Sequence, residues 1–309
     1  MLYYLANSFK EIFGPARLLQ SYAVLIVLAL YAGFFVTLKL LPLFFKFLPS
    51  DRGREFTLTA EAAKGKPTGA GVVFITFFVC LTLVFAPLDG LQLSLLSLTW
   101  LMMLTGYLDD SSVKSWGEYR KALLDFFISL SASVLLAFFT ARENGGALFL
   151  WLPFISGTIE IPMWLYIAAS TVLLWAHLKT GASWAVMTFC LAGVLMGYLW
   201  HNAHPSKVLM GDAGSRALGF YIGVCCMVTG NPFLIFVTST VIFINGGLGL
   251  LKVALKRFLH ISIFKNTRFP LHDEMRKKYG WSPSQIQIKF LMLQLLVSLA
   301  LLGIFFKIR

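Results

Sequence analysis

The sequence predicts an all-α membrane protein: a bundle of about nine transmembrane helices in one domain over residues 1–309. Of its 309 residues, 58% are hydrophobic and only 13% are charged, far from the composition of a soluble domain. Several apolar runs approach the ~20 residues that cross a bilayer. These spans are expected to be helices, because lipid offers no partner to an unpaired backbone group.

Nine runs are apolar enough to be predicted as spans. In chain order they cover residues 23–48, 72–85, 91–108, 122–140, 163–178, 184–200, 213–228, 232–251 and 286–306. Residues 1–20 are amphipathic and are predicted to form a helix that lies in the membrane interface. Residues 147–161 are aromatic but are broken by Pro153 and Gly157, so an interfacial loop is expected there.

The net charge of +12 indicates membrane orientation rather than nucleic-acid binding. Its basic residues gather in three segments between spans, 49–69, 109–121 and 252–284, which the positive-inside rule places in the cytoplasm. Such segments also suit anionic lipid heads and phosphorylated substrates. The four cysteines lie in apolar runs without CxxC spacing, which argues against a metal site or a disulfide framework.

Counting crossings produces a conflict in the second half of the chain. Five spans from an outside N-terminus bring Lys179 inside, and one further crossing over 184–200 would then leave Asp212 outside. The basic segment 252–284, with eight Lys and Arg, would follow two crossings later on that same outside face. The sequence therefore predicts an extra crossing, or a break, between Leu178 and Trp184.

The stretch 201–219, HNAHPSKVLMGDAGSRALG, is the strongest candidate for chemistry. Asp212 lies there between two predicted spans, and Gly211 and Gly214 allow the backbone to approach a ligand closely. A carboxylate among exposed backbone N–H groups near a helix start suits a phosphate-bound cation. From this stretch alone, an aspartate that caps a tight loop is an equally good interpretation.

The third predicted span ends at Asp109 and Asp110. The orientation that the basic segments favour puts this acidic pair and Asp212 on the same membrane face. A few carboxylates at one membrane face, surrounded by basic residues, suit Mg²⁺ and a polyphosphate. Lys64 and Lys121 could hold phosphate oxygens there. The alternatives are a hydrated helix end for the acidic pair and ordinary cytoplasmic charge for each lysine.

Pro270-Leu271-His272-Asp273-Glu274 is a compact polar cluster within the last basic segment. An imidazole at His272 could bind a phosphate or a sugar, and a merely solvated histidine is the alternative.

Four blocks together carry a family resemblance: YLDD at 107–110, KGKPTGAG at 64–71, NAHPSKVLMGDAGS at 202–215, and PLH at 270–272 with Gly280-Trp281 after it. Over roughly residues 60–300 they resemble the polyprenyl-phosphate N-acetylhexosamine-1-phosphate transferase superfamily. Their order and spacing are most similar to its phospho-N-acetylmuramoyl-pentapeptide transferase branch.

The resemblance implies a ten-span enzyme of the bacterial inner membrane with its active site on the cytoplasmic face. Such an enzyme moves phospho-MurNAc-pentapeptide from UDP-MurNAc-pentapeptide to undecaprenyl phosphate, with Mg²⁺ as cofactor, and yields lipid I and UMP. Membrane lipid and a second copy in a homodimer are further expected partners, and nucleic acid is not.

The resemblance also assigns roles to individual residues. Asp212 matches the metal-binding aspartate, with Asp109 as a second metal ligand. Asp109 and Asp110 match the acidic pair that deprotonates or positions the lipid phosphate. The implied substrate-binding residues are Lys64 and Thr68 in the KPTG block, Lys121 at a phosphate, Asn202 at the nucleotide, and His272 as the first member of a histidine run.

Three departures from the family pattern leave other functions open. Leu209 replaces an aromatic residue, Asp273-Glu274 replace further histidines, and 177–184 stands where an Asp-rich motif and one span, roughly 40 residues, are expected. A catalytically impaired relative that binds polyprenyl phosphate, or a transferase for another UDP-HexNAc, are the alternatives. A transporter ranks lowest, because the charges lie at span ends rather than at mid-membrane.

Overall fold

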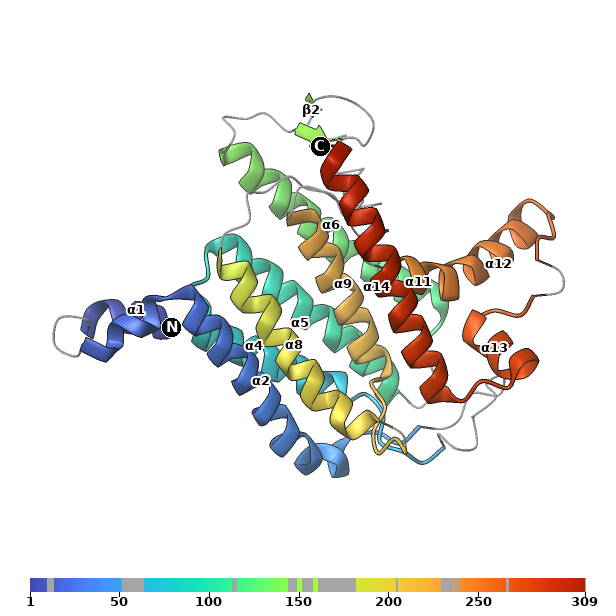
Figure 1. The fold of residues 1–309 in the computed structure, drawn as a ribbon, viewed down its shortest axis with the longest axis horizontal. Helices are drawn as coiled ribbons and strands as arrows, with labels where there is room; N and C mark the ends of the chain where they lie inside the picture. The colour runs from blue at the N-terminus through green and yellow to red at the C-terminus, as the bar shows by residue number, and fades with distance from the viewer. Residues whose placement is uncertain are drawn as a thin grey trace. The chain divides into compact units, whose positions relative to one another are not determined.

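The computed structural model describes the whole chain except residues 10–13, 52–63, 113–115, 144–148, 152–157, 161–181, 204, 229–235, 237–238, 265–266 and 309. The chain divides into two compact units (Figure 1). The first comprises Met1–Trp151 with Gly157–Pro232, and the second comprises Leu152–Ser156 with Phe233–Arg309. Each is described by itself below, and the expected single domain over 1–309 stays a prediction.

The first unit is a bundle of long apolar helices, which confirms the all-α fold class. Its helices are α2 (Tyr22–Phe44), α4 (Gly71–Phe85), α5 (Gly90–Ser111), α6 (Glu118–Glu143), α8 (Ala182–Asn202) and α9 (Gly211–Val228). Among the described residues, four helical segments are long and apolar enough to cross a membrane: Tyr22–Phe47, Gly90–Ser111, Tyr119–Arg142 and Ser183–Asn202. These helices coincide with six of the predicted spans, whereas the predicted span 163–178 lies outside the described residues.

Two short regions were expected to form an interfacial helix and a loop. Residues 1–20 contain α1 (Leu2–Phe9) and the 3-10 helix η1 (Gly14–Gln20), and residues 10–13 between them lie outside the described residues. Within 147–161, β1 (Phe149–Trp151) pairs antiparallel with β2 (Thr158–Glu160), where a loop was expected. Aromatic and β-branched residues in both stretches favour extended pairing.

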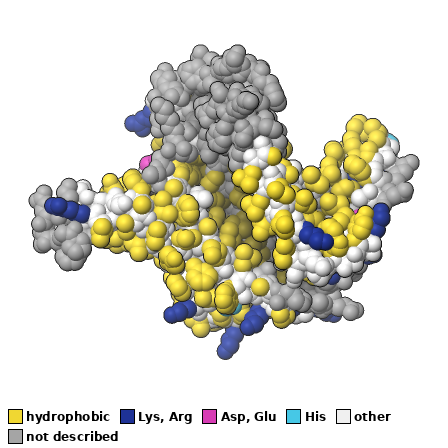
Figure 2. All heavy atoms as spheres, in the orientation of Figure 1, with side chains coloured by type: hydrophobic (Ala, Val, Ile, Leu, Met, Phe, Trp, Pro, Cys, Tyr) yellow, Lys and Arg dark blue, Asp and Glu magenta, His cyan; other side chains and the backbone are white. Residues whose placement is uncertain are grey.

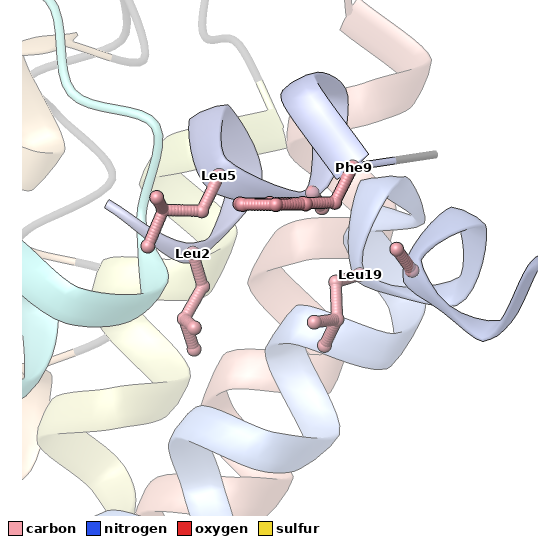
Figure 3. A pocket seen from close by; sticks show the side chains of 6 residues that line it. Leu2, Leu5, Phe9 and Leu19 are labelled. Carbon is pink, nitrogen blue, oxygen red and sulfur yellow. The ribbon is translucent and has the colours of Figure 1, made fainter. Parts of the chain in front are cut away.

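The helices α1 and η1 enclose an apolar hollow of the first unit (Figure 3). Its lining consists of Leu2, Leu5, Ala6, Phe9, Ala16 and Leu19. The amino group of Met1 donates a hydrogen bond to the carbonyl of Leu83, near the end of α4, at 2.9 Å. This contact fixes α1 at the end of α4 that lies away from Gly71.

Helices α2 and α8 run parallel and pack closely along their lengths. A Cβ on Gly193 would overlap the carbonyl of Leu30, and one on Gly197 would lie 2.7 Å from the carbonyl of Phe34. Four residues further along both helices, the imidazole of His201 hydrogen-bonds the carbonyl of Leu38 at 2.8 Å. Gly193-x-x-x-Gly197 is the small-residue spacing that lets transmembrane helices approach.

The order of helix ends shows on which side of the first unit Asp212 lies. The start of α5 lies beside the end of α6, where a Cβ on Gly90 would contact Phe139, and beside the start of α8, where Gln92 donates to Ser183. At the other end of α5, a Cβ on Gly106 would lie 2.5 Å from the carbonyl of Asp212. Thus α6 ends and α8 begins on one side of the first unit, and Asp212 lies on the opposite side with the end of α5.

Asp212 therefore lies on the same side of the first unit as Asp109 and Asp110, as a common site requires. The described part of the interval Leu178–Trp184 is the first turn of α8, which begins at Ala182. Residues 161–181 lie outside the described residues, so the extra crossing or break stays a prediction.

The second unit contains α11 (Thr240–Ile242), the π-helical turn η3 (Phe243–Gly247), α12 (Leu248–Phe258), α13 (Leu271–Tyr279) and α14 (Pro283–Ile308). The predicted last span, 286–306, lies within α14. Within the expected span 232–251, residues 240–251 lie in α11, η3 and the start of α12, which continues to Phe258, and residues 232–235 and 237–238 lie outside the described residues, so the span's boundaries stay a prediction. The lysines and arginine of α12 stand on its amphipathic surface and allow the helix to continue into the basic segment.

Hydrophobic side chains cover the sides of the helices in the first unit, and Lys and Arg side chains gather where α2 and α8 end (Figure 2). On α2, exposed residues include Val27, Tyr31 and Phe35, whereas Leu25 and Ala29 are buried. An apolar outer surface around a packed interior is the arrangement expected of helices in lipid. The chain is a multi-pass membrane protein.

Close packing of α2 and α8 gives a testable consequence for stability. Gly193→Ala would place a methyl group against the backbone of Leu30, which side-chain motion cannot relieve. We expect a loss of about 1–3 kcal/mol in the free energy of unfolding, measured as a lower Tm of the detergent-solubilised protein. Gly219→Ala is the matched control, because a Cβ at this exposed helical position meets nothing within 4 Å. Equal Tm values for the two variants would contradict the packing.

Candidate functional site

Three helix ends bring the charged residues of the site together. Asp109 and Asp110 lie in the last turn of α5, Lys121 near the start of α6, and Asp212 in the first turn of α9. The ammonium of Lys121 forms ion pairs with Oδ2 of Asp109 and, at 3.2 Å, with Oδ2 of Asp212. The structure therefore joins four of the residues that the sequence selected as candidates.

Asp110 caps helix α9 and does not face Lys121. Its Oδ1 accepts a hydrogen bond from the backbone N–H of Asp212, and its Oδ2 accepts one from that of Ala213, both at 3.0 Å. A carboxylate at a helix start satisfies orphan N–H groups and is favoured by the helix dipole. The expectation that these N–H groups are exposed for a phosphate is wrong, because Asp110 occupies them. The cap of α9 is Asp110 from another helix, not Asp212.

The KPTGAG and MGD blocks bind each other through their backbones. The N–H of Leu209 donates to the carbonyl of Pro67 at 2.8 Å, and the N–H groups of Ala70 and Gly71 donate to the carbonyls of Leu209 and Met210 at 3.1 Å. The first block thus supports the loop that carries Asp212. Leu209 donates and accepts in this pairing through backbone atoms only.

Gly69 and Gly211 adopt positive φ angles of 74° and 71° in these two loops. A Cβ on Gly211 would overlap Oδ2 of Asp110 and lie 2.6 Å from the N of Gly69. Gly211 therefore permits both the left-handed backbone and the approach of the capping carboxylate.

The other candidates in the first unit lie around this loop. The amide of Asn202 donates to the carbonyl of Val208 at 2.7 Å, which ties the end of α8 to the loop before Asp212. The N–H of Thr68 donates to the carbonyl of Pro49 at 2.7 Å, and Lys64 is exposed in the turn before it. Their roles in binding a nucleotide or a phosphate stay predictions.

His272 belongs to the second unit, so its place beside the carboxylates also stays a prediction. Its backbone N–H and its ring Nδ1 both donate to the side-chain oxygen of Asn245, at 2.9 and 3.0 Å. Asn245 lies in the π-helical turn η3, an irregularity that is frequent at functional sites. The two hydrogen bonds fix the ring and leave Nε2 on the side of Asp273, 3.7 Å from its Oδ1.

Exposure differs across the carboxylate cluster and sets the direction of approach. The side chain of Asp109 is 5% exposed, whereas those of Lys121 and Asp212 are 27% and 25% exposed. The N–H of Trp116 donates to Oδ1 of Asp109 at 2.7 Å, behind the ion pair. A ligand would therefore meet Lys121 and Asp212 first, with Asp109 beneath them.

A scan against family models matches residues 164–230, which include Asp212, to glycosyl transferase family 4. The phospho-N-acetylmuramoyl-pentapeptide-transferase of Treponema pallidum (strain Nichols) is 46% identical, over 96% of this chain and 94% of its own length. The protein of the same name from Wolbachia sp. subsp. Brugia malayi (strain TRS) is 27% identical, over 87% and 95%. This chain belongs to the phospho-N-acetylmuramoyl-pentapeptide transferase family.

Within the phospho-N-acetylmuramoyl-pentapeptide transferase family, this chain is short. Its alignment with the Treponema relative spans 343 positions, against 309 residues in the whole chain. At least 34 positions of that relative therefore have no counterpart here. The expected absence of one span and its Asp-rich motif near 177–184 stays a prediction.

One ion pair was not expected from the sequence. Arg216 of α9 pairs with Asp125 of α6, one turn beyond the cluster. Each residue lies one turn inside its predicted span, close to the span end rather than at mid-membrane. Their signal was available, since an ionisable residue inside an apolar span is a functional candidate by default.

The two hydrogen bonds that Asp110 accepts from α9 predict a structural role for Asp110, distinct from the role of Asp109 in the ion pair with Lys121. Asp110→Asn replaces one acceptor oxygen by an NH₂ group that faces a backbone N–H donor. We expect a loss of about 0.5–2 kcal/mol in the free energy of unfolding, seen as a lower Tm of the purified protein. Asp212→Asn keeps both backbone bonds of Asp110, because only the N–H of residue 212 takes part in them, and is the control. A Tm that does not change in Asp110→Asn would refute the cap.

Proposed function

We propose that this chain transfers phospho-MurNAc-pentapeptide from its UDP-linked donor to undecaprenyl phosphate, forming lipid I and UMP. The observation that carries the proposal is the Asp109–Lys121–Asp212 cluster, built from family motifs at the ends of three helices. The names of the relatives support the same reaction.

The residues of the cluster suit an attack of one phosphate on another. An oxygen of the lipid phosphate attacks the β-phosphorus of the UDP-sugar, and the bond to UMP breaks. Two anions must approach each other, so their charges have to be offset and their positions fixed. The exposed part of Lys121 would hold a phosphate oxygen, while Asp212 and Asp109 keep the ammonium in place.

The donor set of the cluster fits Mg²⁺. Asp109 and Asp212 already share one cation, the ammonium of Lys121, and Mg²⁺ binds through one or two carboxylates together with phosphate oxygens. Three carboxylates against one ammonium leave a net charge of −2, opposite to that of the ion. Asp212 and Asp109 would hold it, and when bound it would offset negative charge on the pyrophosphate. Each oxygen of Asp110 already accepts a backbone hydrogen bond from α9, so we assign the ion to Asp109 and Asp212 rather than to Asp110.

We place the enzyme in the bacterial inner membrane with the cluster on the cytoplasmic face. The basic segments around the cluster support this orientation through the positive-inside rule, and a cytoplasmic face gives access to a water-soluble UDP-sugar. A homodimer stays a prediction.

A catalytically impaired relative is the second candidate, favoured by the chain's shortness against its Treponema relative. Such a protein would keep the cluster and bind polyprenyl phosphate but would not turn over a UDP-sugar. Binding of the lipid phosphate without binding of the UDP-sugar distinguishes it from an active transferase.

Transfer of radiolabelled sugar phosphate to undecaprenyl phosphate tests the main proposal. With Mg²⁺, the full-length protein should form a labelled lipid product, and Asp212→Asn should lower kcat by about 100-fold or more through loss of a charge at the reacting phosphates. The Tm should change little, because the backbone N–H of residue 212 still reaches Asp110. No product under conditions in which a homologue works would reject the proposal. Near-normal kcat in Asp212→Asn would reject the role of its carboxylate.

A common site further requires one membrane face for the cluster and the basic segment of the second unit. Tyr119, Lys207 and Lys278 are exposed and suit single-cysteine labelling on a background without the four native cysteines. In sealed vesicles, all three positions should react with an impermeant maleimide from the same side. Labelling of 278 from the side opposite to 119 and 207 would exclude His272 from the site.

A further inference from the structure

Two ion pairs, one helical turn apart, link α6 to α9. The first joins Lys121 to Asp212 at 3.2 Å, and the second joins Asp125 to Arg216. Lys121 and Asp125 are four residues apart on α6, and Asp212 and Arg216 are four apart on α9. The two charged residues of each helix therefore lie on one face of that helix, about 6 Å apart along its axis. Charges alternate along each helix and across the gap between them.

This arrangement specifies one register of α6 against α9. A shift by one turn in one direction would place Lys121 against Arg216, and a shift in the other direction would place Asp125 against Asp212. Both shifts bring like charges together in a medium that screens them poorly. Only the observed register gives every charge an opposite neighbour on its own helix and across the gap.

The register matters because, among the described residues, the backbone of α6 approaches that of α9 far less closely than it approaches that of α5. In the described part of the chain, α6 makes its close backbone contacts with α5. Lys121 lies near the start of α6, where the helix begins at Glu118. First-turn residues of a helix fray more readily than interior residues. Asp125 lies one turn further in and can anchor the turn that carries Lys121.

The burial of the second pair indicates that it is more than a surface contact. The side chain of Arg216 is 13% exposed and that of Asp125 is 39% exposed. Two further guanidinium nitrogens of Arg216, Nε and Nη1, are buried and have no hydrogen-bond partner among the described residues. A guanidinium in this setting depends strongly on its one carboxylate, since a buried unpaired charge is costly.

We propose that Asp125 and Arg216 are positioning residues that hold the ammonium of Lys121 against Asp212. They act on the reaction through Lys121 and touch neither substrate. The inference rests on the proposed transferase function for its kinetic test, but its structural test is independent of turnover.

Arg216→Gln tests the kinetic consequence. It removes the charge of the second pair while keeping a polar, although shorter, side chain, so Lys121 should lose its fixed place. We expect kcat to fall by about 10- to 100-fold, with KM for both substrates within about twofold, because binding of the remote parts of the substrates is untouched. Arg216→Lys keeps the charge opposite Asp125 and should recover most of kcat.

Arg142→Gln is the matched control. It also removes an arginine, but from the exposed far end of α6, where no residue of the cluster lies. Its kcat should equal that of the unmodified protein. An unchanged kcat in Arg216→Gln, equal to this control, would overturn the positioning role, as would a loss that Arg216→Lys does not recover.

A distance measurement supplies the readout that does not depend on turnover. Leu123→Cys on α6 and Ile222→Cys on α9 are exposed positions, 57% and 41%, for a pair of spin labels on a cysteine-free background. Arg216→Gln should broaden or shift the distance distribution, whereas Arg216→Lys should preserve it. Loss of kcat with an unchanged distribution would mean that Arg216 acts on a substrate directly, and would overturn the proposal. If the unmodified protein shows no transfer at all, the proposed function fails and this distribution alone decides the inference.

Discussion

The hydrogen bonds that Asp110 accepts from the start of α9 hold the site together. They join the C-terminal end of α5, where carbonyl groups lack partners within the helix, to the N-terminal end of α9, where N–H groups lack partners within the helix. The negative end of one helix dipole thus meets the positive end of another, with a carboxylate between them. Successive residues of a helix point about 100° apart. While Asp110 reaches α9, Asp109 is consequently directed to α6 and Lys121.

This junction requires backbones to approach within van der Waals contact, and glycine makes the approach possible. A Cβ on Gly71 would overlap the backbone of Gly214, and one on Gly106 would press on the carbonyl of Asp212. The glycines near Asp212 were interpreted as places for a ligand to approach the backbone. In the structure, Gly211 and Gly214 admit Asp110 and the start of α4 instead. Small residues in a motif indicate close approach, but sequence alone does not show what approaches.

Much of the first unit could be predicted because lipid constrains it so strongly: α2, α4, α5, α6, α8 and α9 agree with apolar runs to within a few residues at most ends. Motif order also selected Asp109, Lys121 and Asp212 correctly as neighbours. The separate roles of Asp109 and Asp110 could not be predicted, because the YLDD motif does not show which carboxylate caps a helix and which pairs with a lysine. The pair Asp125–Arg216 was missed for a related reason. Each residue lies one turn inside its span, whereas the candidate residues were chosen among the charges at the span ends.

The two layers of charge differ in their balance, and this difference follows their depth. At the helix ends, three carboxylates meet one ammonium, and the partly exposed side chains of Lys121 and Asp212 face the direction from which a ligand approaches. One turn deeper, one carboxylate meets one guanidinium, so that layer carries no net charge. An excess of negative charge is tolerable only where water or a cation can reach it, whereas the largely buried guanidinium of Arg216 needs a carboxylate to neutralise it. The unbalanced layer is therefore the one suited to bind a cation and a phosphate, and the balanced layer is suited to hold the helices that carry it.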